Sequence, residues 1–319
     1  MFTRDVLQLD CAQAVEQICK TLEKQVRGTM KKRGAVVGIS GGIDSSVVAA
    51  LCVRALGKKR TYGLFMPERA SSGDSLELGR LLATDLGIES QLCDIAPALE
   101  GLGCYSALDH AVKSQFPEYS EGYKFKISLP SILEGNRLNV YRLTIESPSG
   151  KQQTKRMSLE SYLEVVAATN YKQRVRKMTE YFHADRLNFA VAGTPNLLEY
   201  DQGFFVKQGD GAADFKPIAH LYKTQVYALA EYLGVPREIR TRPPTTDTYT
   251  MAQSQEEFYF ALPHDKMDLC LYAHNHGVAA SEVAPVLEVT PEQIEIVFAD
   301  IESKRRFAQY LHMQPLLVG

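Results

Sequence analysis

Residues 35–56 constrain the fold more than any other stretch, because a buried strand, a glycine turn and an apolar helix follow one another directly. Residues 35–39 are apolar and mostly β-branched, which predicts a buried strand. Residues 44–56 predict a helix that ends at Gly57. The turn between them reads Ser-Gly-Gly-Ile-Asp-Ser-Ser. A strand that turns straight into a helix is the first half of a β-α-β unit.

The same alternation recurs along the chain and predicts an α/β fold, with a parallel sheet covered by helices on both faces. Apolar runs predict three more strands, and the helical spacing of apolar residues predicts helices before, between and after them. The expected strands are 60–67, 89–95 and 187–194, and the expected helices are 12–28, 71–88, 159–185 and one within 217–236.

Two regions depart from this alternation. Residues 120–158 alternate polar and apolar side chains around the turn sequence Ser-Pro-Ser-Gly, which predicts a β-rich insertion. Residues 253–319 predict a mostly helical C-terminal extension. We therefore expect one domain over residues 1–319 that carries these two additions.

The charge balance and the cysteines indicate the class of partner and the compartment. The chain has 36 basic and 38 acidic residues and a net charge of −2, which gives no general attraction for nucleic acid or an anionic membrane. No apolar run approaches the ~18 residues of a membrane span. The six cysteines are scattered, without a Cys-x-x-Cys pair. Buried thiols in a reducing, cytoplasmic protein fit this pattern best.

The turn after the first strand has the composition of a phosphate-binding loop. Gly41 and Gly42 let the backbone approach an anion closely, and the helix N-terminus adds partial positive charge. The hydroxyls of Ser40, Ser45 and Ser46 can donate to phosphate oxygens. Asp44 would repel a polyphosphate unless a cation lay between them, and Mg²⁺ is the oxygen-binding ion suited to that place. The loop therefore predicts a magnesium–polyphosphate site.

Other interpretations of this loop stay open at this point. It is not a Walker A loop, since no Gly-Lys-Ser/Thr follows, and it lacks the Gly-x-Gly-x-x-Gly pattern of dinucleotide sites. A plain helix N-cap after a turn, with Asp44 in the first turn, would explain part of the pattern.

Two motifs together resemble a known family. Ser-Gly-Gly-x-Asp-Ser resembles the pyrophosphatase loop of the N-type ATP pyrophosphatases, which have a Rossmann-like fold and split ATP between its α and β phosphates. Residues 193–236 closely resemble the core of ammonia-dependent NAD synthetases, and Asn170-x-x-x-Arg174-x-Arg176 matches a helix of that family. The resemblance covers roughly residues 10–105 and 165–250.

The resemblance implies a role for individual residues. It makes Asp44, Glu199 and Lys223 catalytic, with Asp44 and Glu199 as the Mg²⁺ ligands. It places four residues against deamido-NAD, namely Arg174, Lys207, Asp214 and Lys304. The implied ATP contacts are Gly38, Ser40, Gly41, Gly42, Asp44, Ser45, Ser46, Thr194, Lys223 and Thr245.

The resemblance also implies a two-step reaction. The nicotinate carboxylate of deamido-NAD attacks the α-phosphorus of ATP, pyrophosphate leaves, and ammonia then displaces AMP to give NAD. The implied assembly is a homodimer. Its ammonia is either free or supplied by a separate glutaminase, because no nitrilase-like domain is visible in the sequence.

Departures from the family pattern lie on the side of the acid substrate. Ser303-Lys304 stands where a His-Lys pair is usual, and Ala261 and His264 stand where Gly and Tyr are usual. An amide ligase that adenylates another carboxylic acid therefore stays an alternative. We also considered tRNA thiolation, a non-catalytic nucleotide-binding module, and a zinc site at Cys270, His274 and His276.

Overall fold

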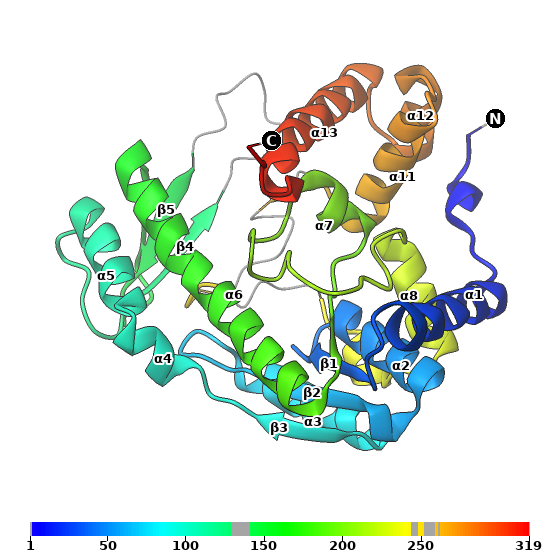
Figure 1. Cartoon of the computed structure of the whole chain (residues 1–319). Helices are drawn as coiled ribbons and strands as arrows, with labels where there is room; N and C mark the ends of the chain where they lie inside the picture. Colours follow the sequence, from blue (N-terminus) through cyan, green and yellow to red (C-terminus); the bar gives the residue numbers. More distant parts are fainter. Residues whose placement is uncertain (1, 129–140, 244–247, 252–258, 261, 319) are drawn as a thin grey trace.

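The computed structural model describes residues 2–128, 141–243, 248–251, 259–260 and 262–318. Its centre is a parallel sheet in the order β3-β2-β1-β7. The strands are β1 (Ala35–Gly38), β2 (Thr61–Phe65), β3 (Glu89–Leu92) and β7 (Ala190–Ala192). Val36 of β1 pairs with Tyr62 on one side and with Val191 on the other. The strands and their parallel order confirm the predicted fold class (Figure 1).

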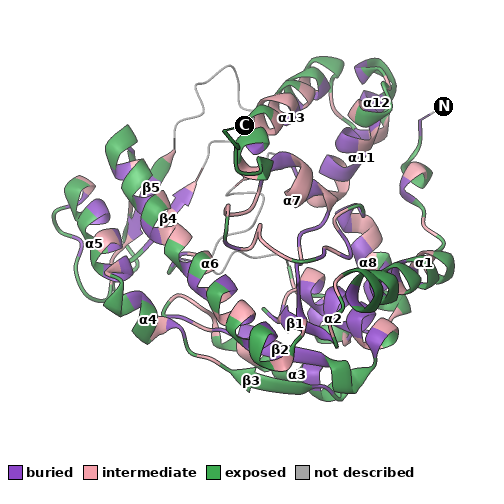
Figure 2. Ribbon diagram, in the orientation of Figure 1, coloured by how far each residue is buried: buried purple, intermediate pink, exposed green. Residues whose placement is uncertain are grey.

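Helices cover both faces of this sheet. Ala35 and Val37 face an apolar core shared with α1 (Cys11–Glu23), α2 (Ile43–Leu56) and α8 (Lys223–Tyr232). Val36 and Leu64 face a second core, shared with α5 (Cys104–Gln115) and α6 (Leu159–Leu187). The alternation of side chains along β1 therefore divides the two layers. Figure 2 shows the inner strands buried, whereas β3 is exposed at the edge of the sheet.

The remaining helical elements include members of a third apolar core, to which Leu7, Leu198, Leu271 and Ile294 belong. They are η1 (Arg4–Leu7), η2 (Lys24–Thr29), η3 (Lys58–Arg60), α3 (Gly73–Leu86), α4 (Ala96–Gly101), α7 (Leu197–Gln202), α9 (Arg237–Arg240), α11 (His264–Asn275), α12 (Ala280–Leu287) and α13 (Pro291–His312). The elements expected from the sequence do not include α4 and α5, although Leu108, Ala111 and Val112 have the helical spacing of a buried face. None of the described helices is long and apolar enough to cross a membrane.

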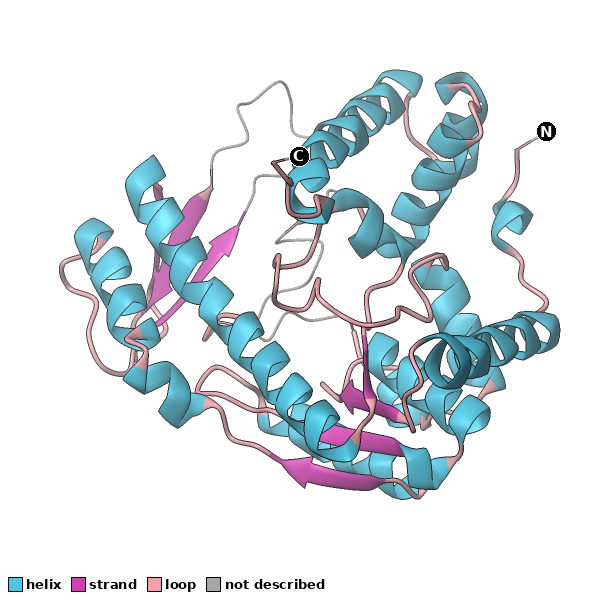
Figure 3. Cartoon of the chain, viewed as in Figure 1, coloured by secondary structure: helices cyan, strands magenta, loops and turns pink. Residues whose placement is uncertain are grey.

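The predicted insertion contains an antiparallel sheet of β4 (Lys124–Ser128), β5 (Arg142–Glu146) and β6 (Gln152–Arg156). Its apolar face, including Phe125 and Leu143, belongs to the same core as α5 and α6. This sheet confirms the β-rich character of the region, while residues 129–140 lie outside the described residues. The boundaries of the insertion and of the C-terminal extension stay predictions. Figure 3 shows the extension as helices above the main sheet.

Candidate functional site

The glycine loop connects β1 to α2 in a conformation that its sequence requires. Gly41 has φ +76°, and a Cβ atom there would lie 2.4 Å from the carbonyl oxygen of Ser75. A side chain at this position would therefore be strained and would also clash with α3. The N-cap residue of α2 is Gly42, which supplies no side-chain acceptor to the first helical turn. The plain N-cap interpretation therefore does not account for the serines that follow.

The three serines of the loop have different surroundings. The Oγ of Ser45 accepts a hydrogen bond from the backbone N–H of Ser40 at 3.2 Å and donates to the carbonyl of Gly42 at 3.1 Å. The buried hydroxyl of Ser46 donates to the same carbonyl at 2.8 Å. Ser40 and Ser45 line a cavity that is described below. Ser46 does not line it and instead stabilises the turn through its bond to Gly42.

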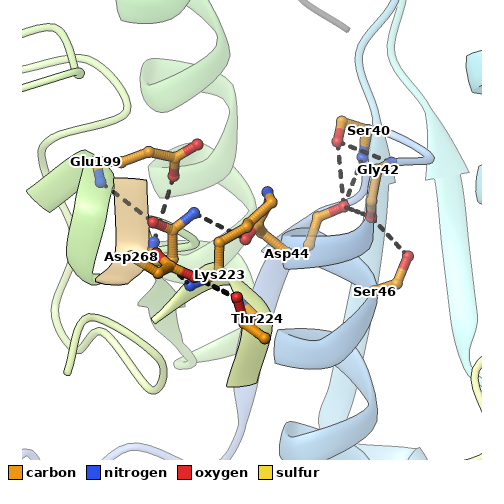
Figure 4. A network of polar contacts seen from close by, with 10 residues as sticks. Ser40, Gly42, Asp44, Ser46, Glu199, Lys223, Thr224 and Asp268 are labelled. Carbon is orange, nitrogen blue, oxygen red and sulfur yellow. Dashed lines mark hydrogen bonds and ion pairs between the residues drawn. The ribbon is translucent and has the colours of Figure 1, made fainter. Parts of the chain in front are cut away.

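Asp44 is held between two residues from the other half of the chain (Figure 4). One carboxylate oxygen forms an ion pair with the ammonium group of Lys223, the first residue of α8. The other accepts a hydrogen bond from the Asn196 amide at 3.0 Å. The Lys223 side chain is only 3% exposed. In the sequence, Asn196 lies 152 positions from Asp44 and Lys223 lies 179 positions from it.

Glu199 lies next to this pair because of the way in which α7 begins. Asn196 is the N-cap of α7, and its side-chain oxygen accepts a hydrogen bond from the Glu199 N–H at 3.1 Å. The Glu199 carboxylate accepts a hydrogen bond from the Asn196 N–H at 3.3 Å. This reciprocal capping box orients both side chains. Asn196 therefore links the two acids, and the Asn-x-x-Glu spacing could have revealed it in the sequence.

Burial and mutual charge perturb the ionisation of this cluster. Burial, together with the negative charge of Asp44, raises the pKa of Glu199 to about 8. Burial alone would lower the pKa of Lys223, but Asp44 and Glu199 outweigh it and raise that pKa to about 12. The site therefore holds a permanent ammonium, while burial and repulsion by Asp44 disfavour the ionised form of Glu199. A further cation would relieve this repulsion.

The donor set suits Mg²⁺, which prefers oxygen ligands and keeps positions for substrate phosphates. Asp44 and Glu199 supply two carboxylates, and the described residues contain no cluster of three or more His, Cys, Asp or Glu side chains. Cys270 is buried, His274 contacts Glu302 at 2.7 Å, and His276 stacks on Tyr272. The structure thus gives the residues of the zinc alternative other partners.

A cavity of about 510 Å³ opens over the carboxyl ends of β1 and β7. Ligands bind at this edge in open α/β sheets. The candidate ATP contacts that line it are Gly38, Ser40, Gly42, Asp44, Ser45, Thr194 and Lys223, and Glu199 lines it too. Gly41 and Ser46 instead shape the loop. Thr245 lies outside the described residues.

A second buried ion pair in this cavity was missed by sequence reasoning. Lys177 contacts Glu180 at 2.6 Å on α6, and both side chains line the cavity. A Cβ atom on Gly38 would lie 2.8 Å from a Glu180 carboxylate oxygen, so a side chain there would displace the Glu180 carboxylate. Burial raises the pKa of Glu180. Within a basic helical stretch, nothing in the sequence indicated that this pair points inward.

The expected contacts to the acid substrate do not line the cavity. Arg174 is exposed and donates a hydrogen bond from its Nε atom to the Lys207 carbonyl at 3.3 Å. Lys207 donates from Nζ to the carbonyls of Tyr310 and Met313, at 2.8 and 3.2 Å. Both residues therefore lie where the loop after α7 meets the end of α13.

Asp214 and Lys304 are also held by protein groups. Asp214 accepts hydrogen bonds from the Val191 N–H at 2.7 Å and from the Tyr181 hydroxyl at 3.2 Å. Lys304 pairs with Asp300 at 2.7 Å and donates to the Tyr259 carbonyl at 2.7 Å. Burial lowers the pKa of Lys304. Lys304 is not among the residues that line the cavity, and its role at the substrate stays a prediction.

Asp268 is a further member of the polar cluster that the sequence did not reveal. It comes from α11 and accepts a hydrogen bond from the Lys223 N–H at 3.2 Å. Figure 4 shows it beside Lys223 and Thr224. No local motif marks this acid, because its partners lie more than forty positions away in the sequence.

Comparisons with known proteins agree with this geometry. The family model described as NAD synthase matches residues 14–116 and 136–309. A relative from Mesorhizobium japonicum named NH(3)-dependent NAD(+) synthetase is 63% identical over 312 residues, which are 98% of this chain and 98% of the relative. A Rhizobium meliloti protein of the same name is 54% identical, over 100% of this chain and 95% of its own.

Solved structures share the fold at lower identity. The NMN synthetase of Francisella tularensis has a TM-score of 0.62 at 23% identity and covers 98% of this chain and 99% of its own. The NH3-dependent NAD synthetase of Campylobacter jejuni has a TM-score of 0.61 at 24% identity, over 98% and 100%. These structures support the fold, while the family model and the closer relatives support the family. The resemblance predicted from the two motifs is confirmed, and the chain belongs to the NAD synthase family.

Proposed function

We propose that this protein forms NAD from deamido-NAD and ammonia at the expense of ATP, releasing AMP and pyrophosphate. The observation that carries the proposal is a polar cluster beside the glycine loop. In it, Asp44 contacts Lys223 and Asn196, and Asn196 contacts Glu199. The family of the chain, and the name of its relative at 63% identity, support the same reaction.

The first step forms a bond between a carboxylate oxygen of deamido-NAD and the α-phosphorus of ATP. The bond from that phosphorus to the bridging oxygen breaks, and its electrons leave with pyrophosphate. The glycine loop offers backbone N–H groups and the start of α2 to the phosphates. Lys223 adds positive charge where the leaving group develops its negative charge. No side chain needs to act as a covalent nucleophile.

Asp44 and Glu199 would hold Mg²⁺ in this reaction. When bound, the ion neutralises phosphate charge and orients the triphosphate. The fit rests on two oxygen-donor side chains that are joined through Asn196, with the pKa of Glu199 raised by burial and by Asp44. A nearby divalent charge favours the ionised carboxylate, so Mg²⁺ and the Glu199 proton compete.

The second step exchanges AMP for nitrogen. A neutral ammonia molecule attacks the carbonyl carbon of the mixed anhydride, AMP leaves with the electrons of the C–O bond, and one proton is lost. AMP is a much better leaving group than the oxide of a free carboxylate. We propose free ammonia as the nitrogen donor, in keeping with the names of the relatives. A separate glutaminase is not needed for this chemistry.

The assembly that we propose is a homodimer formed through α6. Large apolar side chains on this helix are exposed, namely Leu159, Leu163, Tyr171, Met178 and Phe182. The Phe182 residue, for example, is 64% exposed. A second copy of the chain could cover this stripe with the same stripe of its own, since twofold contacts are self-complementary. The six free cysteines further support a reducing, cytoplasmic location.

The β-rich insertion also contributes to the cavity. Tyr141, just before β5, stacks on Tyr162 of α6 with ring centroids 4.2 Å apart, and both rings line the cavity. The insertion sheet is anchored by its apolar face, so this pair is held in place. We propose that the insertion forms one wall of the substrate cavity.

The proposal is tested by product stoichiometry. The purified protein is incubated with ATP, Mg²⁺ and ammonium, together with deamido-NAD or nicotinic acid mononucleotide. The expected result is equal amounts of NAD, AMP and pyrophosphate with deamido-NAD. Faster AMP formation with the mononucleotide or another acid would support the alternative amide ligase instead. Omission of each acid measures the background hydrolysis of ATP.

A further inference from the structure

Asp268 is a wholly buried acid that contacts the beginning of a different helix. Its Oδ1 atom accepts a hydrogen bond from the backbone N–H of Lys223 at 3.2 Å. Its Oδ2 atom accepts one from the Thr224 N–H at 2.7 Å and another from the Thr224 hydroxyl at 2.6 Å. Asp268 belongs to α11, whereas Lys223 and Thr224 are the first two residues of α8.

This contact is a helix cap supplied by another segment of the chain. The first N–H groups of an α-helix have no acceptor within the helix, and negative charge is favourable near them. Asp268 satisfies two of these groups with one carboxylate. It therefore fixes both the position and the direction of the first turn of α8.

The first residue of α8 is also the one whose ammonium group reaches the phosphate loop. Lysine has a flexible four-carbon stem, so the location of its charge depends on how firmly its Cα atom is held. Lys223 is anchored at its backbone by Asp268 and at its Nζ atom by Asp44. Because Asp268 already accepts from the backbone N–H groups, Lys223 acts on a phosphate through its side chain.

We propose that Asp268 is a positioning residue for Lys223 in the formation of the adenylated carboxylate. Through this one carboxylate, the C-terminal helices influence chemistry at the edge of the main sheet. The inference rests on the proposed function, in which Lys223 contacts the phosphates.

The surroundings of Asp268 argue against an incidental contact. Its neighbours Met267 and Leu269 are buried in the apolar core of the C-terminal helices. An acid in such a core is costly unless its oxygens are fully hydrogen-bonded. Burial raises the pKa of Asp268, while the hydrogen bonds from Thr224 and Lys223 oppose that rise. The hydrogen bonds to α8 thus compensate an acid that packing alone would disfavour.

A double-mutant cycle separates positioning from stability. The variants are Asp268→Asn, Lys223→Met and the combination, with Met267→Ala as a control that disturbs the same helix. Deamido-NAD-dependent pyrophosphate release is measured well below the melting temperature of every variant. We expect Asp268→Asn to lower kcat about 10-fold to 100-fold, the range for a lost charge-assisted hydrogen bond. Met267→Ala should lower the melting temperature and leave kcat within about twofold.

The combined variant decides the matter. If Asp268 acts through Lys223, Asp268→Asn should change kcat less than about twofold once Lys223→Met is present, since residues that act as a unit are not additive. An equal loss in both backgrounds would overturn the positioning role and leave a structural one. If Lys223→Met alone keeps full kcat, the proposed role of Lys223 fails first, which is a distinct result.

A milder pair keeps the test valid if Asp268→Asn does not fold. Thr224→Val removes the hydroxyl donor and Thr224→Ser keeps it. We expect Thr224→Val to lower kcat about threefold to tenfold, as for one neutral hydrogen bond, with Thr224→Ser close to the unmodified protein. Equal kcat in both variants and the unmodified protein would contradict the proposal.

Discussion

The phosphate loop and the acid-substrate side of this molecule differ in how their polar groups are partnered. Around the loop, Asp44 contacts both Asn196 and Lys223, and the side chains of Asp44 and Lys223 line the cavity. On the other side, Lys207 donates to carbonyls at the end of α13, and Asp214 accepts a hydrogen bond from the Val191 N–H of β7. The polar groups of the first region thus face the cavity, whereas those of the second are engaged by other groups of the protein.

This difference predicts separate kinetic effects. Changes near the loop should affect the adenylation step itself, whatever the acid. Changes at Lys207 and its neighbours should affect how well the acid binds and should leave the bound complex reactive. Interactions made only in the transition state lower kcat, whereas interactions made equally in the ground state change KM.

Asp44→Asn should have the largest effect. The amide keeps the shape of Asp44 but removes the charge that pairs with Lys223 and would bind Mg²⁺. We expect kcat for pyrophosphate release to fall at least about 10³-fold, the upper range for loss of one preorganised electrostatic group. Circular dichroism and the melting temperature check that the variant is folded. A loss below about tenfold would contradict the assignment of Asp44.

Glu199→Gln should come next and should change the pH profile. Burial and the charge of Asp44 raise the pKa of Glu199 to about 8, so the free enzyme ionises this group only above neutral pH. At limiting Mg²⁺, kcat/KM for ATP should rise between pH 7 and pH 9 in the unmodified protein. The variant should be about 10²-fold slower and flat over this range. An unchanged rise in the variant would assign the titration to another group.

Lys207→Met should have a smaller effect, confined to the acid substrate. Loss of one charge-assisted hydrogen bond, worth about 1.5–3 kcal/mol, should raise KM for deamido-NAD about 10-fold to 100-fold. The value of kcat should change little. Because Lys207 also donates to the Tyr310 and Met313 carbonyls, melting curves must accompany the kinetics. A fall in kcat with an unchanged KM would remove the distinction between the two regions.

The smallest expected effect is on stability without substrates. The folded-state pKa of Glu199 is raised from its ordinary value of 4.5 to about 8. A raised acid pKa gives stability that is fully present below pH ~4.5 and is lost as pH rises through ~8. Glu199→Gln stays neutral and loses nothing over this interval. The difference in melting temperature, variant minus unmodified protein, should therefore increase by a few degrees between pH 5 and pH 9.

The sequence predicted those parts of the molecule that depend on local pattern. The loop could be predicted from its own neighbours in the sequence: the apolar run of residues 35–39, the glycines and the helix after them. The resemblance of the second block implied the roles of Glu199 and Lys223, and the structure places both side chains at the cavity. Glu199 is oriented by the local start of α7, whereas Lys223 also depends on contacts with distant residues.

The parts that were missed depend on contacts between distant segments. Asp268 meets α8 only because the C-terminal helices fold back onto it. Lys177 and Glu180 lie in a helix with exposed apolar residues, such as Met178, as well as buried ones, so its pattern did not indicate which face points inward. The substrate roles of Lys304, Arg174, Lys207 and Asp214 stay predictions, and Lys304 pairs with Asp300 on its own helix.

The central claim is that the phosphate loop and its acids transfer AMP to the carboxylate of deamido-NAD. The most direct measurement follows a heavy-oxygen label placed in both oxygens of that carboxylate. During a single turnover with ATP, Mg²⁺ and ammonium, one labelled oxygen should move to AMP for each NAD formed, because the carboxylate oxygen becomes an oxygen of AMP when ammonia displaces it. Label that stays out of AMP, or that appears in pyrophosphate, would contradict the claim.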